Sequence, residues 1–156
     1  MQYKSLSLIA MRFALTFSII RFNISCLFAN DFGMRNILIV GVGGFLGSVI
    51  RYKLGGLVLH HAFDWKFPIS TFVVNVTGCL IAGVLAGLVE KHDFFTAEIR
   101  LLLFTGILGG FTTFSAFGVE TVFLIQRHDY LVATANVILS VAAGLMALGI
   151  GIRIAG

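Results

Sequence analysis

The chain has 156 residues, of which 58% are hydrophobic and 12% are charged, with a mean hydropathy of +1.01 and a net charge of +4. A soluble globular domain carries roughly 25% charged residues, so a water-facing surface would be short of charge here. The composition therefore argues against a soluble protein and for a lipid-embedded one. In a lipid-embedded protein the small positive excess calls for no nucleic-acid partner.

Residues 1–33 precede the first apolar stretch that is long enough to cross a membrane. Arg12 and Arg21 interrupt their apolar run, which makes both a membrane span and a signal peptide a poor fit. We expect Met34 to be the natural start and residues 1–33 to be an over-extended reading frame, with an interfacial amphipathic anchor as the alternative. The membrane domain is then expected over residues 34–156.

Four apolar stretches follow, each close to the roughly 20 residues with which a helix crosses hydrocarbon. They run from about Asn36 to Leu59, Ile69 to Val89, Ile99 to Gln126, and Tyr130 to Ile152. The connectors between them are short and leave no room for a soluble domain. The sequence therefore predicts an all-α integral membrane protein with four transmembrane helices, and such a chain suggests a bacterial inner membrane.

The 18 glycines of this apolar chain indicate helices that pack closely through small residues. A run around position 44 looks like a dinucleotide-binding turn, but position 46 is Leu where that motif needs Gly, and no acidic residue follows a second strand. We therefore expect close helix contacts at the glycines that lie four residues apart on one helix face: Gly43 with Gly47, Gly83 with Gly87, and Gly106 with Gly110.

The third span contains the sequence GGFTTFS over residues 109–115, which is poor helix material. Paired glycines weaken a helix, and threonine and serine hydroxyls compete for its backbone hydrogen bonds. We expect this helix to break in mid-membrane. Non-helical backbone at that depth is tolerated where protein buries it or where it lines a cavity, and its freed carbonyls can hold a cation such as Na⁺.

Polar side chains inside the other spans cost free energy in lipid and usually face a partner or a water-filled path. Thr71 and Asn75 share one face of the second span. In the fourth span, Asn136, Ser140 and Gly144 recur at every fourth position. The two interpretations are a polar path and helix-to-helix hydrogen bonding, and the second carries more weight for Asn136 than for Asn75.

Phe114 and Phe117 follow the expected break and would share a helix face. Packing is the ordinary role of phenylalanine. An aromatic ring nevertheless has a positive edge, which can attract an anion where a full positive charge would hold it too tightly. Glu120 lies in the last third of the same span, where it either faces the following connector or takes part in the polar path.

At these residues the sequence closely resembles the fluoride-specific ion channel family known as Fluc or CrcB. The matching motifs are Gly43 to Gly47 followed by Arg51-Tyr52, Pro68 through Asn75 to Gly78, and Gly109 to Phe117. Together with the four-span plan they cover residues 34–156. This chain departs from many relatives in having Ala116 in place of a threonine, Ile69-Ser70 in place of Leu-Gly, and Gly144 in place of a second pore serine.

The resemblance implies an antiparallel, dual-topology homodimer with two fluoride pores at the subunit interface, through which cytoplasmic fluoride leaves passively. The pore residues that it implies are Asn75, Phe114, Phe117, Ser140, Thr113, Ser115 and Glu120. It places Arg51 in a structural or vestibule position. It also implies a structural Na⁺ at the dimer interface, held by the backbone carbonyls of Gly109 and Thr112.

Two other functions are open to a chain of this kind. A proton-coupled exporter that resembles the small multidrug family would need a carboxylate in the first span, and Asn36 to Leu59 contains none. A non-transporting assembly protein would use its polar residues only to join helices, so Asn75→Ala would alter its assembly with no ion flux to lose. No Ser/His/Asp or Cys/His constellation within the spans indicates an enzyme.

The Lys and Arg residues of the connectors, the chain ends and the outer parts of the spans bear on orientation. With four spans, one side carries four bases and the other side carries four, namely Arg35, Lys91, Arg100 and Arg153 against Arg51, Lys53, Lys66 and Arg127. This balance favours insertion in both senses.

We predict that a tag at the C-terminus is accessible from both sides of the membrane, and labelling of intact and permeabilised cells would measure this. Labelling from one side only would contradict dual topology.

Overall fold

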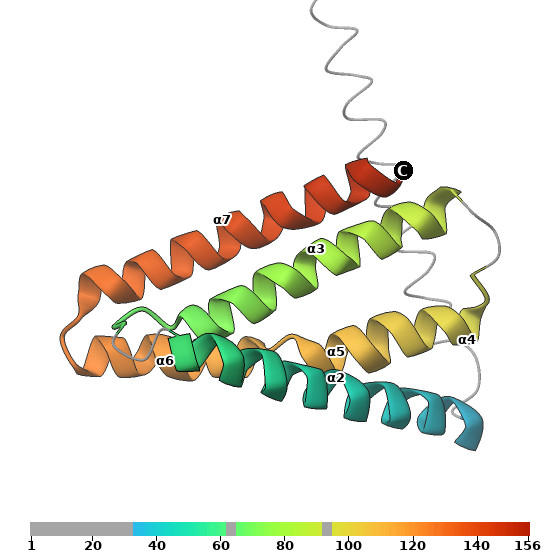
Figure 1. The fold of residues 1–156 in the computed structure, drawn as a ribbon, viewed down its shortest axis with the longest axis horizontal. Helices are drawn as coiled ribbons and strands as arrows, with labels where there is room; N and C mark the ends of the chain where they lie inside the picture. Colours follow the sequence, from blue (N-terminus) through green and yellow to red (C-terminus); the bar gives the residue numbers. More distant parts are fainter. Residues whose placement is uncertain (1–32, 62–64, 92–94) are drawn as a thin grey trace, which may run out of the picture. The chain divides into compact units, whose positions relative to one another are not determined.

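The structure is a computed structural model that describes residues 33–61, 65–91 and 95–156. In these ranges all regular structure is helical (Figure 1). The elements are α2 (Met34–His61), α3 (Ile69–Lys91), α4 (Ala97–Arg100), the π-helix η1 (Leu101–Leu108), α5 (Gly109–Phe111), α6 (Phe114–Gln126) and α7 (Tyr130–Ala155). The contacts described below lie within Ile37–Gly156, which forms one compact unit.

Four helical stretches are long and apolar enough to cross a membrane. They are Met34–His61, Ile69–Lys91, Ala97–Gln126 and Tyr130–Ala155. The prediction of an all-α protein with four spans is confirmed, and the first helix extends slightly beyond the predicted range at both ends. The expectation for residues 1–33 falls almost wholly outside the described residues.

An extensive helix pairing joins α3 and α7, which lie side by side along their length (Figure 1). Glycines make this approach possible. A Cβ atom built on Gly151 would lie 2.5 Å from the Leu80 carbonyl oxygen and 2.7 Å from the Val84 nitrogen. A Cβ atom on Gly87 would lie 2.8 Å from the Ile152 carbonyl oxygen. The two backbones are thus closer than any side chain at these positions would allow.

A second glycine seam joins α2 to the third span. A Cβ atom on Gly43 would lie 2.8 Å from the Cα atom of Gly106, and one on Gly47 would lie 2.8 Å from the Phe111 nitrogen. Gly110 packs equally closely against the Gly44 backbone. The close contacts predicted at the spaced glycine pairs are therefore confirmed on both seams.

The third span departs from the α-helical conformation in two places. Leu101–Leu108 is a π-helix, a wider form that the sequence did not predict. After the short α5, Thr112 (φ −83°, ψ 156°) and Thr113 (φ −147°, ψ 115°) are extended, and α6 begins at Phe114. The two extended residues lie within the segment 109–115, where a break was expected.

Two connectors meet on one side of the helices. Lys66, in the connector between α2 and α3, places its Nζ atom 3.3 Å from Oδ1 of Asp129, in the turn between α6 and α7. An exposed ion pair of this kind contributes little stability. It does show that the first and third connectors are on the same side, as a four-span topology requires.

Most of the apolar surface of this single chain points outward. Among the described residues, the buried hydrophobic side chains are only Val74, Phe95, Leu108, Phe111, Leu124 and Ala133. Large side chains such as Leu131 (86% exposed) and Phe114 (83% exposed) face away from the other helices. This arrangement fits a protein whose apolar side chains contact lipid or another membrane-embedded chain.

We predict that Gly151→Ala lowers stability by about 1–3 kcal/mol, because its methyl group would overlap the α3 backbone. The matched control is Gly149→Ala in the same helix, where a Cβ atom would have no neighbour within 4 Å. That control should be neutral or slightly stabilising, since alanine favours helix over glycine. Thermal unfolding in detergent measures both variants, and equal effects would contradict the close approach.

Candidate ion-conduction site

A reciprocal pair of hydrogen bonds connects α3 to the break in the third span. The Asn75 Nδ2 atom donates to the Thr113 carbonyl oxygen at 3.0 Å, and the Thr113 amide nitrogen donates to Asn75 Oδ1 at 2.8 Å. One side chain therefore pairs with both backbone groups of the extended residue. Because the backbone N–H can only donate and the C=O can only accept, the pair also fixes which way the amide points.

The fixed amide leaves one donor available. A side-chain amide has two N–H donors, and Asn75 uses one of them on Thr113. The second has no partner among the described residues. The side chain is half-buried, and a neutral N–H at such a position can bind an anion while adding no charge to the span.

The two phenylalanine rings stand at the start of α6. The ring centroids of Phe114 and Phe117 are 5.5 Å apart with an interplanar angle of 41°. Phe114 is almost fully exposed, whereas Phe117 is half-buried. Phe114 therefore presents its ring to whatever lies outside this chain.

The hydroxyl groups beside the break cap α6. Thr113 Oγ1 accepts a hydrogen bond from the Ala116 nitrogen at 3.2 Å and lies 3.2 Å from Ser115 Oγ. The capping bond satisfies one of the backbone donors left free where the helix begins. These hydroxyls therefore stabilise the break, and Ser115 is exposed beside it.

Glu120 pairs with α3. Thr71 Oγ1 donates to Glu120 Oε1 at 2.6 Å, while Oε2 is buried and has no partner among the described residues. Of the two interpretations of Glu120, the structure supports a place among the polar side chains between α3 and α6. Thr71 lies on the same face of α3 as Asn75, so the two contacts follow each other along one helix.

A separate network joins α7 to α6 through a buried amide. Asn136 is 1% exposed, and its Nδ2 atom donates to Thr121 Oγ1 at 2.9 Å. Thr121 Oγ1 in turn donates to the Phe117 carbonyl oxygen at 2.7 Å, and Ser140 Oγ donates to Asn136 Oδ1 at 3.3 Å. The helix-to-helix interpretation of Asn136 is supported. Ser140 thus donates to a residue of its own helix, and Asn136 makes the hydrogen bond to α6.

Sequence reasoning missed Thr121. Its position four residues after Phe117, on the same helix face, was the available signal. Its partner on α7 could not be found in that way, because the hydrogen bond joins two different helices.

α2 approaches the break from the other side. Arg51 Nη1 lies 3.5 Å from the Thr112 carbonyl oxygen, and Ser48 Oγ lies 3.5 Å from that of Gly110. Both distances are at the long limit for hydrogen bonds. Arg51 is thus placed next to the break, and the Thr112 carbonyl oxygen retains acceptor capacity.

The backbone of the break fits a cation such as Na⁺. In the described part of the chain, no cluster of three or more His, Cys, Asp or Glu side chains could hold a metal ion. The available ligands are neutral carbonyl oxygens, which suit a hard monovalent cation at an unwound helix. Thr112 supplies one such oxygen. Gly109 supplies another, because the Thr113 N–H that would close the next helical turn onto it donates to Asn75 instead.

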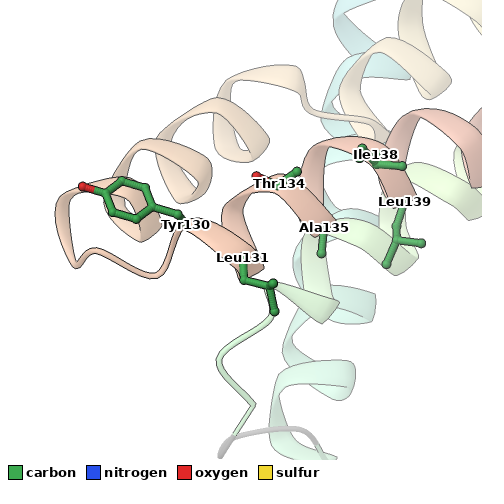
Figure 2. Close-up of a pocket in the computed structure, with 6 residues that line it drawn as sticks. All are labelled: Tyr130, Leu131, Thr134, Ala135, Ile138 and Leu139. Atoms are coloured by element: carbon green, nitrogen blue, oxygen red, sulfur yellow. The ribbon is translucent and has the colours of Figure 1, made fainter.

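The site residues are distinct from a shallow groove on α7. That groove has a volume of about 690 Å³ and lies along the exposed face of α7 (Figure 2). Its lining residues are Tyr130, Leu131, Thr134, Ala135, Ile138 and Leu139. None of the predicted site residues lines it.

This chain is similar in sequence to known proteins. The family described as "CrcB-like protein, Camphor Resistance (CrcB)" matches residues 38–152, which include the break and part of every span. The chain belongs to this CrcB family. Its relatives include proteins named "Fluoride-specific ion channel FluC" from Methylobacillus flagellatus, Flavobacterium psychrophilum and Oceanobacillus iheyensis.

These relatives match over most of their own length. The three are 46%, 43% and 44% identical to this chain over 121, 122 and 127 residues. The match covers 78% of this chain in each case, and 94%, 98% and 92% of the respective relatives. The CrcB resemblance inferred from the glycine, asparagine and phenylalanine motifs is therefore confirmed.

We predict that Asn136 and Thr121 are energetically coupled. A double-mutant cycle of Asn136→Ala and Thr121→Val should give a coupling of about 0.6–1.7 kcal/mol, the range measured for hydrogen bonds between membrane helices. Thermal unfolding of the wild type, the two single variants and the double variant gives this value. Strict additivity would show that the short contact contributes nothing to stability.

Proposed function

We propose that this chain is a fluoride-selective channel of the inner membrane that lets cytoplasmic fluoride leave passively. The observation that carries the proposal is the fixed Asn75 amide, which keeps a spare N–H at the break, where it holds the residue that precedes Phe114. The names of the CrcB relatives support fluoride as the ion. Membership of this family gives no support to the multidrug-type exporter or to the assembly protein.

The chemistry of the site suits a small, strongly hydrated anion. Such an ion enters a narrow path only if donors replace its water shell, and it leaves only if no donor holds it too tightly. The Asn75 N–H supplies a neutral donor. The edges of the Phe114 and Phe117 rings carry partial positive charge and continue the path along α6. Ser115 and Thr113 add hydroxyls at the same level.

Two copies in opposite orientation complete the path. Phe114 faces away from its own chain, so one chain encloses its ring on one side only. A second, antiparallel copy would cover the ring and, by two-fold symmetry, form two equivalent pores. The four-against-four balance of bases supports opposite insertion. Ser140 and Glu120 would lie further along each path, and Arg51 at its approach.

The same dimer provides a place for a structural Na⁺. Each chain offers the Gly109 and Thr112 carbonyl oxygens, and a cation on the two-fold axis would receive both from each copy. Bound there, Na⁺ would supply a fixed positive charge between the two subunits and stabilise the unwound backbone.

We predict that the purified protein in liposomes releases fluoride and retains chloride, and that Asn75→Asp lowers fluoride efflux by at least about 100-fold. Two like charges about 4 Å apart repel by about 4 kcal/mol at an effective dielectric constant of 20, so a carboxylate in place of the amide would oppose anion entry. Fluoride-selective and chloride-selective electrodes measure efflux from liposomes that contain the wild type or Asn75→Asp.

The matched control for this experiment is Thr134→Val, an isosteric change in the α7 groove that should leave efflux unchanged. Size-exclusion chromatography confirms that the variants are folded. Absence of fluoride efflux from folded wild-type protein would refute the channel, and unchanged efflux in Asn75→Asp would remove Asn75 from the path.

A further inference from the structure

We propose that Asn75 is also the positioning residue for the cation site, so that one side chain serves both the fluoride path and Na⁺ binding. By holding the amide N–H of Thr113, it keeps the Gly109 carbonyl oxygen free to bind the ion. This inference rests on the proposed function and adds a second role to a residue of the pore.

The first step concerns hydrogen-bond partners along the third span. In an α-helix each N–H donates to the carbonyl oxygen four residues earlier. The Leu108 carbonyl oxygen has its partner, since the Thr112 nitrogen lies 2.9 Å from it, and Thr112 Oγ1 donates to the same oxygen at 2.9 Å. The next bond in this series would join the Thr113 nitrogen to the Gly109 oxygen. That nitrogen instead donates to Asn75 Oδ1 at 2.8 Å, on a helix 38 positions earlier in the chain.

The second step concerns the conformation of Thr113. The second bond of the pair, from Asn75 Nδ2 to the Thr113 carbonyl oxygen, holds the other end of the same residue at 3.0 Å. Thr113 is extended, with φ −147° and ψ 115°. Its N–H points away from the Gly109 oxygen because ψ of Thr112 is 156°. Without the bond to Asn75 Oδ1, that angle could return to a helical value and close the turn onto Gly109, so the open turn depends on Asn75.

The third step separates the two roles of the amide. The acceptor oxygen serves the cation site, because it alone captures the Thr113 N–H. The donor nitrogen serves the anion path, because it carries the spare N–H. An aspartate at this position would keep the acceptor and lose the donors, whereas a leucine of similar size would lose both. The two substitutions therefore predict different combinations of defects.

The experiment is a Na⁺ titration of the full-length protein in detergent, with thermal unfolding as the readout and N-methylglucamine chloride replacing NaCl at constant ionic strength. We expect Na⁺ to raise the unfolding temperature of the wild type by mass action. For Asn75→Leu, the apparent Na⁺ affinity should fall about tenfold, which corresponds to ~1.4 kcal/mol. For Asn75→Asp, the affinity should be retained although fluoride efflux is lost.

The matched control is Thr71→Val on the same face of α3. This isosteric change removes the hydrogen bond to Glu120 and keeps both groups of the Asn75–Thr113 pair, so its Na⁺ dependence should equal that of the wild type. A tenfold loss in this control would mean that any loosening of α3 weakens the site, and it would overturn the specific role of Asn75.

The outcomes also separate this inference from the proposed function. Wild-type Na⁺ affinity in Asn75→Leu would overturn the inference and leave the channel intact. If Asn75→Leu fails to fold, Asn75→Asp decides, because a tenfold loss of affinity in that variant contradicts a role for the acceptor oxygen.

Fluoride efflux without any Na⁺ stabilisation of the wild type would refute the cation site. Na⁺ stabilisation that depends on Asn75 but without fluoride efflux would support the inference and refute the channel.

Discussion

The structure depends on which groups form hydrogen bonds with the backbone N–H and C=O groups where the third span is not helical. In hydrocarbon, each unpaired N–H or C=O group costs several kcal/mol, so a break in a membrane helix exists only where other groups replace the missing partners. Asn75 does this for both groups of Thr113, and the Thr113 hydroxyl does it for the first turn of α6. Hydrogen bonds from α3 and from the side chains of the break itself therefore stabilise the break.

The glycine seams set the positions from which that support is possible. Gly78 lies one turn after Asn75, and a Cβ atom there would overlap the Thr112 side chain. The absence of a Cβ atom at Gly78 therefore allows α3 to approach the break. The α2 seam at Gly43 and Gly47 likewise brings Ser48 and Arg51 to the carbonyls of the break. Close packing and the polar site are therefore consequences of the same sequence feature.

The sequence predicts the features that lipid imposes directly. A span needs a long apolar run, a helix weakens at Gly109-Gly110 followed by hydroxyls, and small residues permit close contact; each follows from local composition. The π-helix over Leu101–Leu108 has no such signal, because its apolar residues suit either helix type. The pairings of Asn75 with Thr113 and of Asn136 with Thr121 join separate helices. They depend on how those helices pack, and a single sequence does not contain that register.

The chemistry of the pair explains why asparagine suits this position. A side chain that holds both the N–H and the C=O of one residue must offer a donor and an acceptor at a fixed spacing, and an anion path requires a further donor. Serine has a single O–H, aspartate has no N–H, and leucine has neither group. Asparagine has two N–H donors and a carbonyl oxygen, so it can hold the Thr113 backbone and still present one donor. Because the amide is neutral, such a donor would attract an anion without the strong binding of a buried cation, as the proposed path requires.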